Sequence, residues 1–263
     1  MNYATLNNLK TWFANYVATF KTNDTDNDHN IILKEDHTHR VCQEIRYIGE
    51  NLGLNGEDLV LAEITALFHD VGRFEQYIQY GTFADSGSVN HAEFGVDILK
   101  EKQVLKDLNE PEQDLIFRAI SYHNRRDLPS VESERCLFFG KLLRDADKLD
   151  IWQVFTAYYN NDNKNGDGTI VHNLPDTPGI SESIYEELIA RKIANYADAR
   201  NLNDFKLLQV GWIYDVYFEP TLHRIYERHY LESIKNTLPQ SKQIDEIFSE
   251  AHSYFTYRLE SIK

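Results

Sequence analysis

Helical periodicity runs through most of this chain, and few residues interrupt it. Apolar side chains recur at every third or fourth position, and the 263 residues include only six prolines and twelve glycines. One predicted helix, for example, carries Val41, Ile45 and Ile48 on a single face. Segments that alternate apolar and polar residues, which are typical of strands, are scarce. The sequence therefore predicts an all-α fold.

Capping residues and prolines mark where the predicted helices begin. Asn55 can accept hydrogen bonds from the first free N–H groups of a helix, and Pro111 fits a first turn, where its missing N–H costs nothing. Two polar stretches, 21–30 and 160–168, are rich in Asn, Asp or Gly and are expected to be loops. Helices are expected to begin near residues 55, 90, 111, 135, 183, 204 and 241.

Charge and composition exclude several classes of protein. The 42 acidic and 27 basic residues give a net charge of -15, whereas a general nucleic-acid or anionic membrane surface needs a basic patch. The two cysteines, Cys42 and Cys136, form no CxxC pair, so neither a thiolate zinc site nor a disulfide framework is indicated. The first residues lack the features of a signal peptide, and no apolar run reaches membrane-spanning length. We therefore expect a cytoplasmic protein that binds neither nucleic acid in general nor membranes.

Histidine and aspartate residues lie on these apolar faces or at their ends. His37 precedes Val41 on one stripe, and Asp147 lies between Leu143 and Ile151 on another. A single histidine on such a face is most often a core residue, but an aspartate is costly to bury unless it is paired or coordinated. Helices that converge in a bundle bring such residues to one site, and imidazole with carboxylate suits divalent transition metals. Six residues are candidate metal ligands: His37, His69, Asp70, His91, His123 and Asp147.

The order of these residues resembles the HD superfamily of metal-dependent phosphohydrolases. Segment 67–73, Leu-Phe-His-Asp-Val-Gly-Arg, is similar to the central signature of that family, and segment 144–150, Arg-Asp-Ala-Asp-Lys-Leu-Asp, is similar to its closing aspartate motif. The two further histidines, His91 and His123, resemble those of the binuclear branch. The resemblance covers about residues 30–160. It implies an HD-type helical bundle. Since no sharp change in composition marks a second domain, we expect a single domain, with additional C-terminal helices over about 180–263 packed on the bundle.

The resemblance also implies an activity and a role for each site residue. It implies a small phosphorylated metabolite or nucleotide as substrate, attacked by a metal-activated bridging hydroxide. Basic side chains near the ligands suit phosphate, and Arg73 and Lys148 are the ones expected to contact it. The metals are two divalent transition metal ions, with Fe, Mn, Ni, Co and Zn not distinguished. One ion is expected at His37, His69 and Asp147, the second at His91 and His123, and Asp70 bridges them.

Two other functions remain open at this stage. The same six ligands resemble those of HD-fold di-iron oxygenases, which cleave a carbon bond with dioxygen. A non-catalytic module that binds a nucleotide is a third possibility. Within the HD superfamily, cyclic-di-GMP is not expected as the substrate, because Asn124-Arg125-Arg126 follows His123 in place of Gly-Tyr-Pro. The oligomeric state is not predicted.

Overall fold

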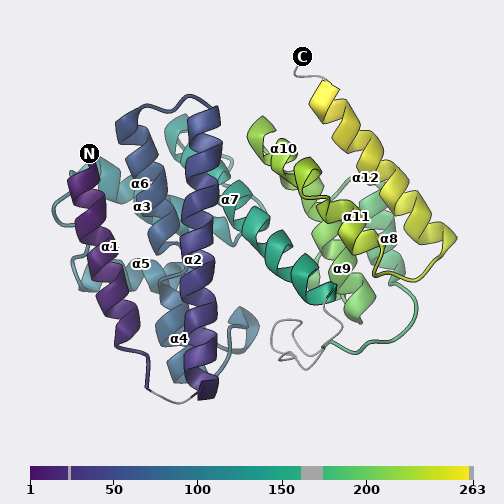
Figure 1. Ribbon diagram of the computed structural model, residues 1–263, viewed down its shortest axis with the longest axis horizontal. Helices are drawn as coiled ribbons and strands as arrows, with labels where there is room; N and C mark the ends of the chain where they lie inside the picture. Colours follow the sequence, from purple (N-terminus) through teal and green to yellow (C-terminus); the bar gives the residue numbers. More distant parts are fainter. Residues whose placement is uncertain (23–24, 161–173, 261–263) are drawn as a thin grey trace. The chain divides into compact units, whose positions relative to one another are not determined.

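The computed structural model describes residues 1–22, 25–160 and 174–260. These residues form helices joined by turns and short loops, with no strand among them (Figure 1), and the all-α prediction is confirmed. The chain divides into two compact units, an N-terminal unit of residues 1–150 and a C-terminal unit of residues 151–263. The prediction of a single domain stays a prediction.

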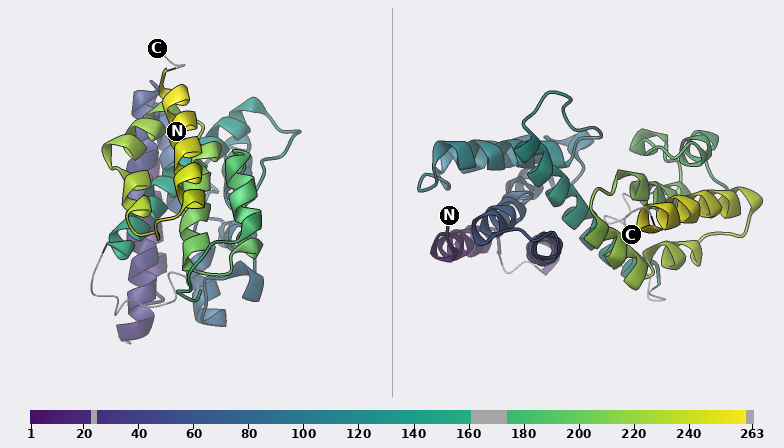
Figure 2. Two further views of the ribbon diagram at one scale, coloured as in Figure 1. Left: turned by 90° about the vertical axis from the view of Figure 1, so that its right-hand side faces the viewer. Right: turned by 90° about the horizontal axis from the view of Figure 1, so that it is seen from above.

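The N-terminal unit is a bundle of helices. Its elements are α1 (Tyr3–Ala18), α2 (Thr25–Asn51), α3 (Gly56–Phe68), α4 (Gly72–Tyr80), α5 (His91–Glu101), α6 (Glu110–His123) and the first part of α7 (Glu134–Tyr159). Helices α1, α2 and α3 run alongside one another, while α5 and α6 lie across them (Figure 2). Helix α4 packs against α5, and α5 packs against α6.

Helix α3 is the centre of this bundle and contacts α1, α2 and α6. Every side chain from Leu59 to Phe68 is buried. The helix starts where the sequence predicts, because the Asn55 side chain accepts hydrogen bonds from the backbone N–H groups of Glu57 and Asp58. Since this central helix ends at Phe68, the two residues that follow it emerge in the middle of the unit.

Two details of the N-terminal unit differ from the predictions. Helix α2 begins at Thr25, so the loop prediction is wrong for residues 25–30. Asn30 and Ile31 are buried, and this packing extends the helix through a stretch whose polar composition favours a loop. No helix was predicted to begin between residues 55 and 90, but α4 begins at Gly72.

The described part of the C-terminal unit contains the rest of α7 and five further α-helices. They are α8 (Glu182–Ile189), α9 (Leu202–Gly211), α10 (Glu219–Glu227), α11 (Tyr230–Lys235) and α12 (Lys242–Glu260). Trp152 is fully buried and its indole N–H donates to the Gln209 carbonyl oxygen at 3.1 Å. The predicted starts near 183, 204 and 241 correspond to α8, α9 and α12, whereas α10 and α11 were not predicted. The loop predicted over 160–168 lies outside the described residues from residue 161 on.

No helix in the described ranges combines the length and the apolar character that crossing a membrane requires.

Candidate metal centre

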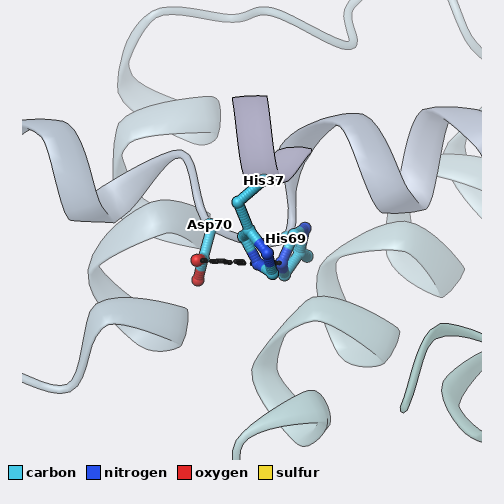
Figure 3. A group of neighbouring side chains, drawn as sticks. All are labelled: His37, His69 and Asp70. Atoms are coloured by element: carbon cyan, nitrogen blue, oxygen red, sulfur yellow. Dashed lines mark hydrogen bonds and ion pairs between the residues drawn. The ribbon is translucent and has the colours of Figure 1, made fainter. Parts of the chain in front are cut away.

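All six candidate ligands meet inside the N-terminal unit, although they come from four helices and from the turn that follows α3. Five of them are buried, and the Asp147 side chain is 17% exposed. Their possible ligand atoms form three overlapping groups, and within each group the atoms lie within 4.8 Å of one another. Figure 3 shows three of the side chains, His37, His69 and Asp70, turned toward a common point. The convergence expected from the helical stripes is therefore present.

Gly72 allows the turn after α3 to approach α5 closely. A Cβ atom at this position would lie 2.3 Å from the carbonyl oxygen of His91 and 2.7 Å from the backbone nitrogen of Gly95. Only a residue without a side chain fits against backbone at that distance. The glycine thus brings Asp70, two residues before it, beside the first residue of α5.

The two oxygens of Asp70 face two different pairs of histidines. Oδ2 lies 3.5 Å from His37 Nε2 and 3.7 Å from His69 Nε2. Oδ1 lies 3.3 Å from His91 Nε2 and 3.7 Å from His123 Nε2. Asp147 Oδ1 adds a second carboxylate to the first pair, 3.2 Å from His37 Nε2. We call His37, His69 and Asp147 the first half of the centre and His91 and His123 the second half, with Asp70 shared.

Every histidine in the centre has its outer nitrogen, Nδ1, held by an acceptor at 2.7 Å. His69 and His123 donate to the backbone carbonyl oxygens of Ala66 and Ile120, three residues earlier in their own helices. A carbonyl oxygen only accepts, so the Nδ1 atoms carry the protons and the Nε2 lone pairs point into the centre. The other two histidines use carboxylates: His37 donates to Asp150 and His91 to Asp85.

This arrangement fits metal ions. Nε2 of His37 lies 3.2 Å from Nε2 of His69, and Nε2 of His91 lies 3.1 Å from Nε2 of His123. Two lone pairs at that distance repel unless a cation lies between them or one ring is protonated. Nitrogen ligands about 2.1 Å from one metal ion lie roughly 3 to 3.5 Å apart. The donor atoms of each half therefore have the spacing and chemistry of ligands to one ion.

Electrostatics place most of these groups in the protonation state that metal binding needs. Burial lowers the pKa of His69 to about 4 and that of His91 to about 3, so both rings are neutral at neutral pH. Burial opposes the ionisation of Asp70, but Lys34 and His69 outweigh it and keep its pKa well below the usual range. His37 differs. Burial and Lys34 lower its pKa, but hydrogen bonds to two aspartates raise it to about 9, so an ion must displace that proton.

Comparison with known proteins identifies this part of the chain. The family described as HD domain matches residues 35–152, a range that includes all six residues of the centre. Residues 35–152 form an HD domain. The resemblance noted in the sequence is thereby confirmed, and the buried histidine and aspartate cluster is consistent with a binuclear HD site. No curated protein and no solved structure matches the chain.

Three further residues contact the candidate ligands of the HD domain and were not predicted. Lys34 Nζ donates to Asp70 Oδ2 at 2.8 Å; its position one turn before His37 on α2 is the sequence signal that could have identified it. Asp150 follows Asp147 by one turn on α7 and could have been found in the same way. Asp85 lies in the loop between α4 and α5, where no periodic pattern points to it.

Arg73 and Lys148, the two basic residues expected to contact phosphate, each follow a candidate ligand closely in the sequence. Arg73 Nη1 donates to Asp85 Oδ1 at 2.8 Å, to Gln76 Oε1 at 2.9 Å and to the carbonyl oxygen of Phe83, and its Nε lies 3.6 Å from Asp70 Oδ1. Lys148 is buried directly after Asp147 in α7. Arg73 thus contacts both the centre and the neighbouring loop, and the phosphate role of both residues stays a prediction.

Proposed function

We propose that this protein is a metal-dependent phosphohydrolase with two metal ions, acting on a small phosphorylated metabolite or nucleotide. The observation that carries the proposal is the position of Asp70 inside an HD domain, with one oxygen facing each pair of histidines. A carboxylate placed in this way can bind two ions at once, one through each oxygen. Six ligands in two halves suit that arrangement better than a single ion.

Each residue of the centre has a proposed role. His37, His69 and Asp147 hold the first ion, His91 and His123 hold the second, and Asp70 bridges them. When bound, such ions lower the pKa of a water molecule toward neutrality and neutralise the charge of a phosphate oxygen. Since imidazole and carboxylate accept Fe, Mn, Ni, Co or Zn, the supply of metal in the cell decides which ion is used.

The positive side chains at the centre favour an anionic substrate. The chain as a whole has a net charge of -15, yet Lys34 and Arg73 both lie against Asp70. Arginine can grip a phosphate through two hydrogen bonds and lysine acts as a point charge. We propose that Arg73 and Lys148 contact the phosphate, and that Arg73 also holds the loop around Asp85.

The test is phosphate release from a panel of nucleotides and sugar phosphates, run without oxygen and with added manganese. The Asp70→Asn variant is the matched blank, because it keeps the shape of the side chain and removes the shared charge. Release by the wild type alone supports the proposal and identifies the substrate class. If the wild type releases no phosphate in this assay but consumes oxygen with a substrate in a separate aerobic assay, the di-iron oxygenase is the correct function. Nucleotide binding without turnover would identify a binding module.

A further inference from the structure

Asp85 connects the second half of the centre to helix α4 and to the end of helix α6. Its Oδ2 accepts a hydrogen bond from His91 Nδ1 at 2.7 Å. The residue begins the short 3-10 turn Asp85–Gly87 in the loop between α4 and α5. Three other side chains donate to the same carboxylate: Arg73 at 2.8 Å, Gln76 at 3.0 Å and Asn124 at 3.2 Å.

His91 needs such a partner because of its place in the helix. His69 and His123 lie at the C-terminal ends of α3 and α6, so a carbonyl oxygen of their own helix is available three residues earlier. His91 is the first residue of α5 and has no earlier turn of helix behind it. The acceptor that fixes its ring must therefore come from outside the helix, and Asp85 supplies it.

The corresponding aspartate of the first half is held much more firmly. Asp150 lies on α7 and its side chain is fully buried, whereas the side chain of Asp85 is 32% exposed and belongs to a loop. The orientation of His91 thus depends on how the loop 81–90 is placed.

We infer that Asp85 is the positioning residue that makes the second half of the centre competent to bind its ion. The inference rests on the two-ion centre of the proposed function. Asp85 does not touch the ion or the substrate. It orients His91 Nε2, and the loop 81–90 thereby determines whether the HD domain holds two ions or one.

The experiment is a calorimetric titration of the full-length, metal-free protein with Mn²⁺, which counts the bound ions and gives an affinity for each. The wild type is expected to bind two ions. Asp85→Ala is expected to bind the first ion as the wild type does and to bind the second ion about 100-fold more weakly. Asp85→Asn keeps an acceptor for His91 Nδ1 and is expected to weaken the second ion by only about tenfold.

Thr82→Ala is the control within the same loop. The Thr82 hydroxyl accepts a hydrogen bond from the Ala84 backbone N–H and touches no ligand, so this variant is expected to bind both ions normally.

A merely structural role for Asp85 would lower the melting temperature and leave the ion count unchanged. Two ions bound with wild-type affinity by Asp85→Ala, or by Asp85→Asn if the alanine variant does not fold, would overturn the inference. So would a single ion in the wild type. The titration measures no hydrolysis, so failure of the proposed phosphohydrolase activity would be seen separately.

Discussion

The two halves of the candidate metal centre hold their histidines with the same arrangement of hydrogen bonds, but the aspartates that accept those bonds differ in their surroundings. In each half, one histidine donates its Nδ1 proton to a carbonyl oxygen of its own helix. The other histidine donates to an aspartate that also pairs with an arginine. These chains of side chains are Arg40–Asp150–His37 in the first half and Arg73–Asp85–His91 in the second.

The supports differ in burial and in charge. Asp150 is fully buried on α7, while Asp85 is partly exposed on a loop. The first half also contains Asp147, so it offers two carboxylates, whereas the second half has only the shared Asp70. More anionic donors on more rigid supports bind a divalent ion more tightly. We therefore expect the first half to fill before the second, and four substitutions test that difference.

The largest effect is expected from Asp70→Asn, because this residue belongs to both halves. The substitution removes the shared charge and leaves four histidines and Asp147 as possible ligands. Both ions are expected to be lost, and any hydrolysis with them. Metal analysis after anaerobic reconstitution with Mn²⁺ measures the loss. Hydrolysis at the wild-type rate by this variant would refute the bridging role of Asp70.

Gly72→Ala is expected to damage the second half selectively. The added Cβ would meet the His91 carbonyl oxygen at 2.3 Å, so α5 must move away from Asp70. Forcing a methyl group into a tight contact destabilises a protein by about 1–3 kcal/mol, which denaturant unfolding measures, and the second ion is expected to be lost. Gly56→Ala is the matched control, since a Cβ there would meet nothing within 4 Å. Normal binding of two ions by Gly72→Ala would contradict this prediction, because it would show that α5 accommodates the added methyl group without loss of the second ion.

Asp150→Asn is expected to act on the first half and leave the second unchanged. The amide oxygen can still accept from His37 Nδ1, but the negative charge that pairs with Arg40 is removed. Loss of such a partner costs about tenfold in metal affinity. Titration with Mn²⁺ should show this change in the tighter of the two affinities. A change confined to the weaker affinity would reverse the assignment of the halves.

The smallest effect is expected from Lys34→Met. The ammonium group lies 2.8 Å from Asp70 Oδ2, the oxygen that faces the first half, and therefore opposes an arriving cation. A partly exposed ion pair contributes at most about 1 kcal/mol, so the first ion should bind roughly fivefold more tightly. The metal-free protein should lose a similar amount of stability. Lys235→Met in the C-terminal unit removes the same charge and should change neither quantity. Weaker metal binding by Lys34→Met would contradict this account.

Local signals explain the parts of the fold that the sequence predicted. Asn55 and Asn90 mark helix starts because their side chains accept hydrogen bonds from N–H groups two and three residues later. The candidate ligands at helix ends could also be predicted from local signals, because a helix fixes where the residues at its end point. His69 and His123 are examples.

Other features depend on contacts that leave no periodic pattern. Asp85 reaches His91 from a loop, so only the folded chain reveals the pair. Helices α10 and α11 are short, and His229 between them has a φ of 52°, in the left-handed region that residues other than glycine seldom adopt. No capping residue or glycine marks that break in the sequence, and two separate helices were therefore not predicted there.

The most direct test of the two-ion centre is the anomalous X-ray diffraction of crystals of the protein loaded with Mn²⁺. Two anomalous peaks are predicted, one on each side of Asp70. The first should lie among His37, His69, Asp70 and Asp147, and the second among Asp70, His91 and His123. A single peak at saturating Mn²⁺, or peaks away from these residues, would contradict the account.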